Sequence, residues 1–99
     1  MKSQIEYPIV MKGVAVPCRF GMSLLVASRV VRMARRYQSK IYLRSGKLKA
    51  DAKSVLSIIL MEAGRGAQMV LSGQGEDADR AVKAISVLFK SEEVLCGKN

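Results

Sequence analysis

Apolar residues repeat along this chain with two different periods, and the alternation between those periods limits the folds it can adopt. In residues 24–37 there is no Gly or Pro, and apolar side chains recur at 26, 30, 33, 34 and 37, which is the spacing of one helix face. Residues 40–44 and 47–50 instead alternate polar and apolar side chains on either side of Ser45-Gly46, which predicts a β-hairpin. Both periods within one short chain indicate an α+β protein.

The rest of the chain continues the same pattern. We predict strands over residues 8–16 and 68–72, a short helix over 55–61, and a last helix that follows the acidic residues 76–79. The predicted order is strand, helix, strand, strand, helix, strand, helix, which favours an α+β layer fold with its helices on one face of the sheet. We expect a single domain over residues 1–99 with its core at about residues 8–92, because 99 residues suit one hydrophobic core.

Two serines stand directly before predicted helices. Ser23 precedes the helix of residues 24–37, and Ser54 precedes the apolar run of residues 55–61. A serine hydroxyl in this position accepts a hydrogen bond from a free N–H group of the first helical turn. We therefore predict that both serines are N-caps.

The residue types present exclude several kinds of chemistry. The chain has no histidine, so the usual general base at neutral pH and the commonest metal ligand are both missing. Cys18 and Cys96 lack the spacing of a zinc site or a redox pair, and we expect reduced thiols. No segment has the length of a membrane span or the apolar block of a secretion signal. We expect a cytoplasmic protein with no metal, no cofactor and no membrane partner.

The positive charge is concentrated in the first half of the chain. The net charge is +9, and residues 1–50 carry eleven Lys and Arg against one acidic residue, Glu6. Helical spacing gathers Arg29, Arg32 and Arg36 on one side of the predicted first helix. This basic face could bind an acidic protein or nucleic acid, although a solvated helix face is the more common explanation of such a pattern.

Two segments of the sequence resemble the HPr family, the phosphocarrier proteins of the sugar phosphotransferase system. Ala52-Lys53-Ser54-Val55-Leu56 is similar to the segment that contains the family's regulatory serine. Residues 66–77, followed by Ala81, are similar to the family's last strand, glycine turn and last helix. The resemblance covers about residues 8–92. It implies an HPr-like open-faced β-sandwich, a four-stranded antiparallel sheet with three helices on one face.

The resemblance also places the family's active-site motif, Gly-x-His-Ala-Arg-Pro-Ala, on residues 21–27. Gly21 and Ala27 match it, whereas Ser23 takes the histidine position, Leu25 the arginine position and Val26 the proline position. A serine phosphate ester is stable, unlike a phosphoimidazole, so Ser23 is not expected to relay a phosphoryl group. We therefore expect no catalytic residue and no enzyme activity.

The family's regulatory site is better preserved. The resemblance implies phosphorylation at Ser54, with Val55, Leu56 and Ile59 as docking contacts and Lys53 beside the phosphate. Ser54 as a plain N-cap is equally compatible with the sequence, and the three apolar residues also suit a core or a dimer contact.

The expected function is therefore that of a binding protein with a regulatory role, similar to HPr variants in which the histidine is replaced and the serine remains. Its expected partners are an HPr serine kinase and a transcriptional or metabolic regulator of the phosphotransferase network. The alternative is an electrostatic adaptor that uses the basic face of the first helix. The sequence does not decide the oligomeric state.

Overall fold

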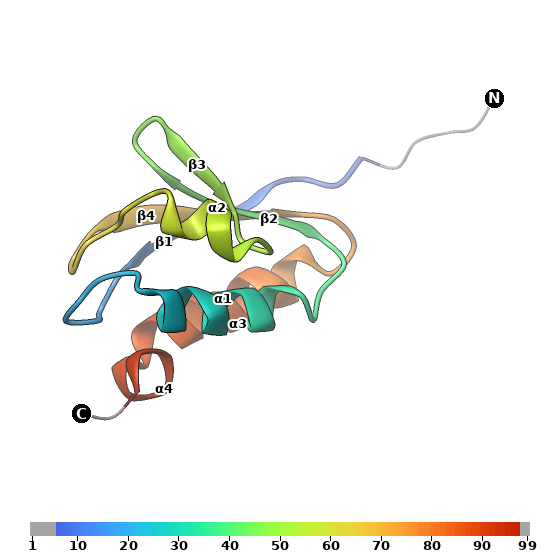
Figure 1. Cartoon of the computed structure of the whole chain (residues 1–99). Coiled ribbons are helices and arrows are strands. Elements are labelled where there is room, and N and C mark those ends of the chain that lie inside the picture. The colour runs from blue at the N-terminus through green and yellow to red at the C-terminus, as the bar shows by residue number, and fades with distance from the viewer. Residues whose placement is uncertain (1–5, 98–99) are drawn as a thin grey trace.

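The computed structural model describes residues 6–97, which form one four-stranded sheet and four helices (Figure 1). In chain order the elements are β1 (Val10–Ala15), α1 (Leu24–Ala34), β2 (Lys40–Ser45), β3 (Leu48–Asp51), α2 (Val55–Ile59), β4 (Gln68–Gln74), α3 (Ala78–Lys90) and α4 (Glu92–Cys96).

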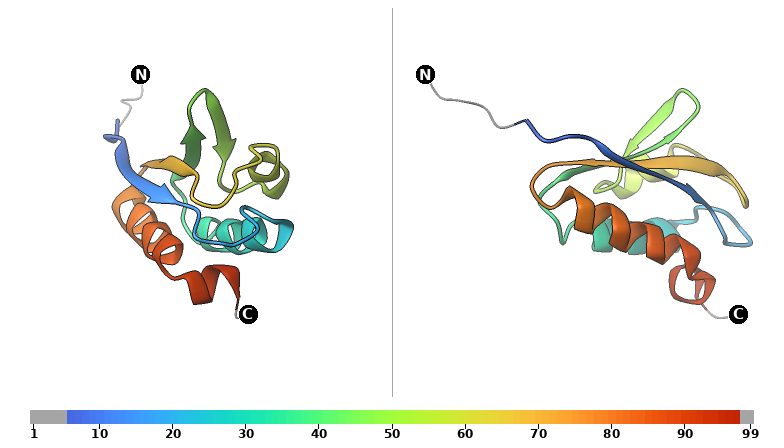
Figure 2. Two further views of the ribbon diagram at one scale, coloured as in Figure 1. Left: turned by 90° about the vertical axis from the view of Figure 1, so that its left-hand side faces the viewer. Right: turned by 180° about the vertical axis from the view of Figure 1, so that it is seen from behind.

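The sheet has the strand order β1-β4-β2-β3, and every neighbouring pair is antiparallel. Helices α1 and α3 lie against one face, and the two views of Figure 2 show that the opposite face has no helix over it. The short helix α2 packs against α1 and follows the β2–β3 hairpin. This arrangement confirms the predicted α+β fold and its open-faced sheet.

The core lies between the sheet and the helices. Alternation along the strands directs Ile41, Leu43 and Leu71 toward the helices, where they are fully buried with Val30 of α1 and Ile85 of α3. Both long helices therefore owe their positions to an apolar stripe that the sequence pattern predicted.

Both predicted N-caps are confirmed. The Ser23 hydroxyl accepts a hydrogen bond from the Val26 N–H at 3.3 Å, and the Ser54 hydroxyl accepts one from the Ser57 N–H at 3.2 Å. The first helix is shorter than predicted: it ends at Ala34, because the N–H groups of Arg36 and Tyr37 donate to carbonyls three residues back and tighten the chain.

The three expected helices are present, and the described residues contain a fourth helix, α4, that was not predicted. Ser91 caps it by accepting from the Val94 N–H at 3.4 Å, and Leu95 is fully buried. The Arg29 guanidinium of α1 donates to the Leu95 carbonyl at 3.0 Å. The segment after α3 is therefore packed onto the helical layer.

The expectation of reduced thiols is also wrong for this structure. Cys18, in the loop before α1, and Cys96, at the end of α4, form a disulfide with their Cα atoms 5.4 Å apart. The two residues are 78 positions apart in sequence, so no local spacing could have paired them. The bond fixes α4 to the loop that precedes Ser23.

No helix among residues 6–97 has both the length and the apolar character needed to cross a lipid bilayer.

Candidate regulatory site and docking surface

The loop before α1 holds Ser23 in a fixed position. Gly21 has a φ of 73°, and a Cβ on it would lie 2.6 Å from the Ala63 carbonyl oxygen, so only glycine fits there. The next N–H, that of Met22, donates to the same carbonyl at 2.9 Å. These contacts connect the start of α1 to the segment after α2, and they explain why a glycine stands two residues before Ser23.

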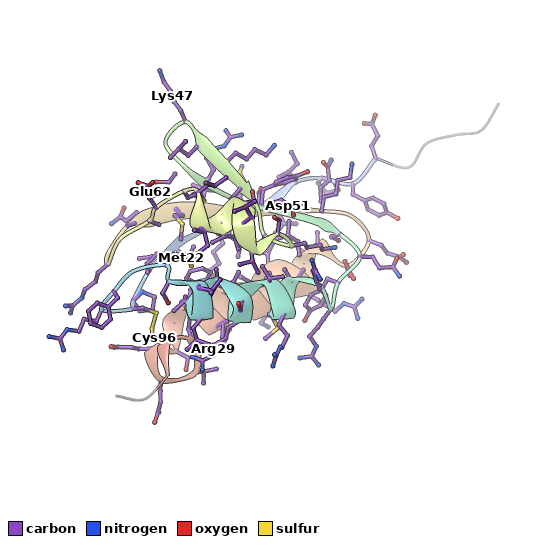
Figure 3. The ribbon with its side chains drawn as sticks, in the orientation of Figure 1. Met22, Arg29, Lys47, Asp51, Glu62 and Cys96 are labelled. Carbon is purple, nitrogen blue, oxygen red and sulfur yellow. A yellow bond between two sulfur atoms is a disulfide. The ribbon has the colours of Figure 1, made fainter. Side chains whose placement is uncertain are left out.

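Ser23 lies exposed at the N-terminus of α1, where the first N–H groups have no partners within the helix. It borders a hollow of about 390 Å³ that the disulfide also lines. The lining residues are Cys18, Arg19, Phe20, Gly21, Ser23, Val26, Glu92, Cys96 and Gly97. Figure 3 shows Cys96 at this end of the molecule, beside the start of α1.

Ser54 is half-buried at the start of α2, between the hairpin and α1. Its N–H donates to the Asp51 carbonyl at 3.0 Å, and its hydroxyl caps the helix. Asp51 also accepts the Lys53 N–H on its carboxylate at 2.9 Å. Asp51 therefore holds the turn before α2, because its carbonyl and its carboxylate accept hydrogen bonds from the Ser54 and Lys53 N–H groups.

Two cationic side chains lie close to the backbone at Ser54. The Lys53 ammonium donates to the Tyr37 carbonyl at 2.6 Å, just beyond the end of α1. The Arg35 guanidinium donates to the Lys53 carbonyl at 3.1 Å. Lys53 therefore binds the C-terminal end of α1. Arg35 is a second cation here; it belongs to the basic segment of the first helix, and the sequence pattern did not connect it with Ser54.

Exposed apolar side chains gather on α2 and at the start of α1. Leu56 is 67% exposed, and Val55 and Ile59 are half-buried against the core. Because α1 and α2 pack together, we define one apolar patch from both elements. Its members are Phe20, Leu24, Leu25, Leu56 and Leu60, all more than half exposed.

The three arginines of the predicted basic face line one groove. Arg29, Arg32 and Arg36 surround a space of about 240 Å³ together with Met33, Leu88 and Val94. Arg32 and Arg36 are exposed, whereas Arg29 is half-buried and donates to α4. The structure thus brings the three together, and it gives Arg29 a structural contact as well.

Asp77 joins the start of α3 to the loop between α1 and β2. Its carboxylate accepts hydrogen bonds from the Ser39 hydroxyl and from the N–H groups of Gln38 and Ser39. The hydrogen bond from the Ser39 hydroxyl, together with the Gln38 N–H, lowers the pKa of Asp77 to about 2. Gly75 closes this junction, because a Cβ there would lie 2.5 Å from the Ser39 Oγ.

Within residues 6–97 there is no group of three or more Cys, Asp or Glu side chains that could hold a metal ion.

Comparison with known families decides the relationship. The family model for the HPr component of the phosphotransferase system, described as its phosphorylation site, matches residues 10–91. The chain belongs to the HPr family. That match spans β1 to the end of α3, so the whole sheet and the three helices expected from the sequence lie inside it.

Several HPr relatives align over most of their length. The chain is 34% identical to the phosphocarrier protein HPr of Treponema pallidum, over 85% of this chain and 96% of that one. It is 33% identical to the phosphocarrier protein NPr of Shewanella violacea, over 82% and 89% of the two chains. It is 26% identical to the HPr-like protein Crh of Bacillus subtilis, over 85% and 99%.

The fold agrees with a solved HPr structure. A phosphocarrier protein HPr from Bacillus anthracis superposes with a TM-score of 0.75 at 26% identity, over 80% of this chain and 94% of that one.

Sequence patterns identified only part of the apolar patch on this HPr fold. Leu56 was predicted as a docking residue, and Leu25 was noted only as the residue in the arginine position. Phe20, Leu24 and Leu60 were missed, because apolar residues next to either end of a helix are interpreted as core until the fold shows that they are exposed.

Proposed function

We propose that this protein is a regulatory, binding-type member of the HPr family that does not relay phosphoryl groups and acts in the cytoplasm as a single domain. The chain contains no histidine, and the residue at the N-terminus of α1 is Ser23. A phosphate ester on serine is a poor phosphoryl donor compared with phosphoimidazole. The helix terminus would stabilise an anion there, but it cannot supply the missing reactivity.

The observation that carries the proposal is the position of Ser54. Ser54 is half-buried, lies at the start of α2, and stands two residues before the exposed Leu56. A phosphate here would add up to two negative charges beside the apolar patch. Phosphorylation would therefore change the charge beside the surface that a partner binds, and so change the partner's affinity for the apolar patch.

The surrounding charges favour that modification. Lys53 precedes Ser54 in sequence, and the Arg35 guanidinium already binds the backbone at Lys53. Both side chains can move toward a phosphate, because each now donates to a single backbone carbonyl. We expect the modified site to be paired with cations.

The relatives support a regulatory role. The chain is 27% identical to the solved Crh of Bacillus subtilis, a catabolite repression protein, and the two superpose with a TM-score of 0.67. By this likeness, the partners proposed here are an HPr serine kinase and a regulator that binds the patch through Leu56, with Val55 and Ile59 beneath it.

The test is site-mapped intact mass after incubation with an HPr serine kinase and ATP. We expect a single phosphate on Ser54 in the wild type and none in Ser54→Ala. Ser57→Ala is the matched control, because Ser57 lies on the same helix and its hydroxyl accepts from the Asp51 N–H. Absence of phosphate from the wild type, or phosphate that persists in Ser54→Ala, would reject Ser54 as the regulatory site.

A second candidate function rests on the arginine groove. This groove is lined by Arg29, Arg32 and Arg36 together with apolar side chains. Its positive charge suits an acidic segment of a partner protein. If this groove is the docking surface, binding of the partner weakens steeply with salt and with Arg32→Gln plus Arg36→Gln, and is unaffected by Leu56→Ser. Binding that is lost in Leu56→Ser, and is unaffected by salt and by the two arginine changes, favours the apolar patch beside Ser54 as the docking surface.

A further inference from the structure

The outer face of the sheet holds a groove that neither function above uses. We call it the sheet groove; it has a volume of about 350 Å³. Its lining residues are Ile9, Met11, Lys40, Tyr42, Arg44, Lys49, Val70, Ser72, Gly73 and Gln74. It lies on the face opposite α1 and α3, which is open in both views of Figure 2.

Strand register explains the shape of the groove. Met11, Ser72 and Tyr42 lie side by side across β1, β4 and β2. The next outward row contains Gly13, Val70, Arg44 and Lys49. The small residue Ser72 leaves the floor of the groove low, while longer side chains rise on both sides.

The two sides of the groove differ in chemistry. Ile9 and Met11 form an apolar side and are 58% and 65% exposed. Lys40, Arg44 and Lys49 form a cationic side on β2 and β3, all exposed to solvent. The Lys49 ammonium lies 4.1 Å from the centre of the Tyr42 ring, which holds this cation over the groove.

No carboxylate lines the groove. The nearest acidic position in register is Asp51, which pairs with Tyr42, and its carboxylate accepts the Lys53 N–H in the turn before α2. The three cations therefore face the groove without an anionic group among its lining residues. The whole chain has a net charge of +9, which attracts polyanions at long range.

The separation of the cations excludes a small single anion as the full occupant. Lys40 and Arg44 are four residues apart on one strand, a distance of about 13 Å at the usual strand rise. An occupant that meets both must carry negative charge repeatedly along its length.

An extended acidic peptide fits this face poorly. The groove lies on a sheet face, where backbone N–H and C=O groups are already paired between strands, so a peptide backbone would find few partners. Peptide groups pressed against Ile9, Met11 and Val70 would lose hydration without compensation. A nucleotide chain avoids this cost, because its bases have apolar faces and its charged backbone can stay at the cationic side.

We propose that the sheet groove binds single-stranded nucleic acid, with bases against Ile9, Met11 and Val70 and phosphates at Lys40, Arg44 and Lys49. The site is independent of Ser54 and of the apolar patch. It also differs from the arginine groove, which lies on the helical side of the molecule.

Fluorescence anisotropy with a labelled single-stranded RNA of roughly twelve nucleotides tests the proposal. We expect binding that weakens about tenfold in Arg44→Gln plus Lys49→Gln, because two phosphate contacts are removed. The matched control is Arg32→Gln plus Arg36→Gln, which removes the same charge from the other side of the molecule. We expect the control to retain most of the affinity, with both variants showing wild-type thermal unfolding.

Met11→Ser separates base contact from charge attraction. It leaves the net charge unchanged, and we expect it to weaken RNA binding about fivefold while leaving heparin binding unchanged. Equal loss in both double variants would mean diffuse electrostatic attraction and would overturn the proposal. So would a poly-glutamate peptide that binds as tightly as the RNA, or an RNA that does not bind the wild type.

Discussion

At the scale of single residues, serines at helix starts have the clearest measurable roles. Ser23 is exposed and is not part of the core, but its hydroxyl accepts a hydrogen bond from the Val26 N–H at the start of α1. We expect Ser23→Ala to lower the free energy of unfolding by about 1 kcal/mol, since alanine cannot cap. Urea denaturation measures this loss. Ser23→Asp should restore stability, and an unchanged midpoint in Ser23→Ala would show that the cap contributes little.

Asp77 should make stability depend on acid pH. Its pKa is lowered to about 2, so the folded chain favours the ionised carboxylate, and the stabilisation is present above about pH 4. It is lost as the pH falls from about 4 toward 2. We expect Asp77→Asn to melt at a lower temperature than the wild type at pH 7. Between about pH 4 and pH 2 its melting temperature should also depend less on pH.

Asp79→Asn is the control for Asp77, because it removes an equal charge from the first turn of α3. Thermal unfolding followed from pH 2 to pH 7 compares the two. If both variants behave alike, the effect belongs to the helix dipole and the Ser39 contact is unimportant.

At the scale of elements, α4 depends on three attachments. Leu95 is buried, Arg29 donates to the Leu95 carbonyl, and the disulfide fixes Cys96 to the loop before α1. A disulfide that joins residues 78 positions apart restricts the unfolded chain strongly, which stabilises the fold by about 4.5 kcal/mol in the chain-entropy model.

We therefore expect Cys18→Ser plus Cys96→Ser to unfold at clearly lower denaturant concentration than the oxidised wild type. Wild type treated with dithiothreitol should match the variant, and maleimide labelling should find two thiols only after reduction. Labelling of both cysteines in the untreated protein would contradict the disulfide.

Sequence patterns predicted all four strands and the three helices of the family, because each has a clear period and a Gly, Pro or Ser boundary. Helix α4 was missed because its five residues begin with two glutamates and show no apolar period, unlike the apolar run of α2. The disulfide was missed because Cys18 and Cys96 meet only once the fold is complete. The sheet groove was not predicted for the same reason: its residues come from all four strands, and they lie together only in the folded sheet.

The candidate site was predicted in part for a related reason. Local signals identified Ser23 and Ser54 as caps, since a cap involves neighbours in sequence. The pairing of Arg35 with the Lys53 carbonyl joins residues 18 positions apart, and no local pattern predicts it.

At the scale of the whole molecule, excess positive charge opposes compaction. The net charge is +9, and folding brings these charges closer together. We expect the melting temperature to rise when sodium chloride is increased from about 20 mM to about 200 mM, because salt screens the repulsion. Calorimetry at pH 7 measures the shift, and a fall in melting temperature would show that favourable ion pairing outweighs repulsion.

The disulfide also gives the covalent chain an unusual topology. Residues 18–96 form a closed ring, and among the described residues this ring contains every helix and every strand except β1. A single protease cut inside the ring would leave both pieces joined until a reductant is added. Force applied to the chain on either side of this ring would pull on β1 while the disulfide holds the rest together, so the sheet would open first at β1.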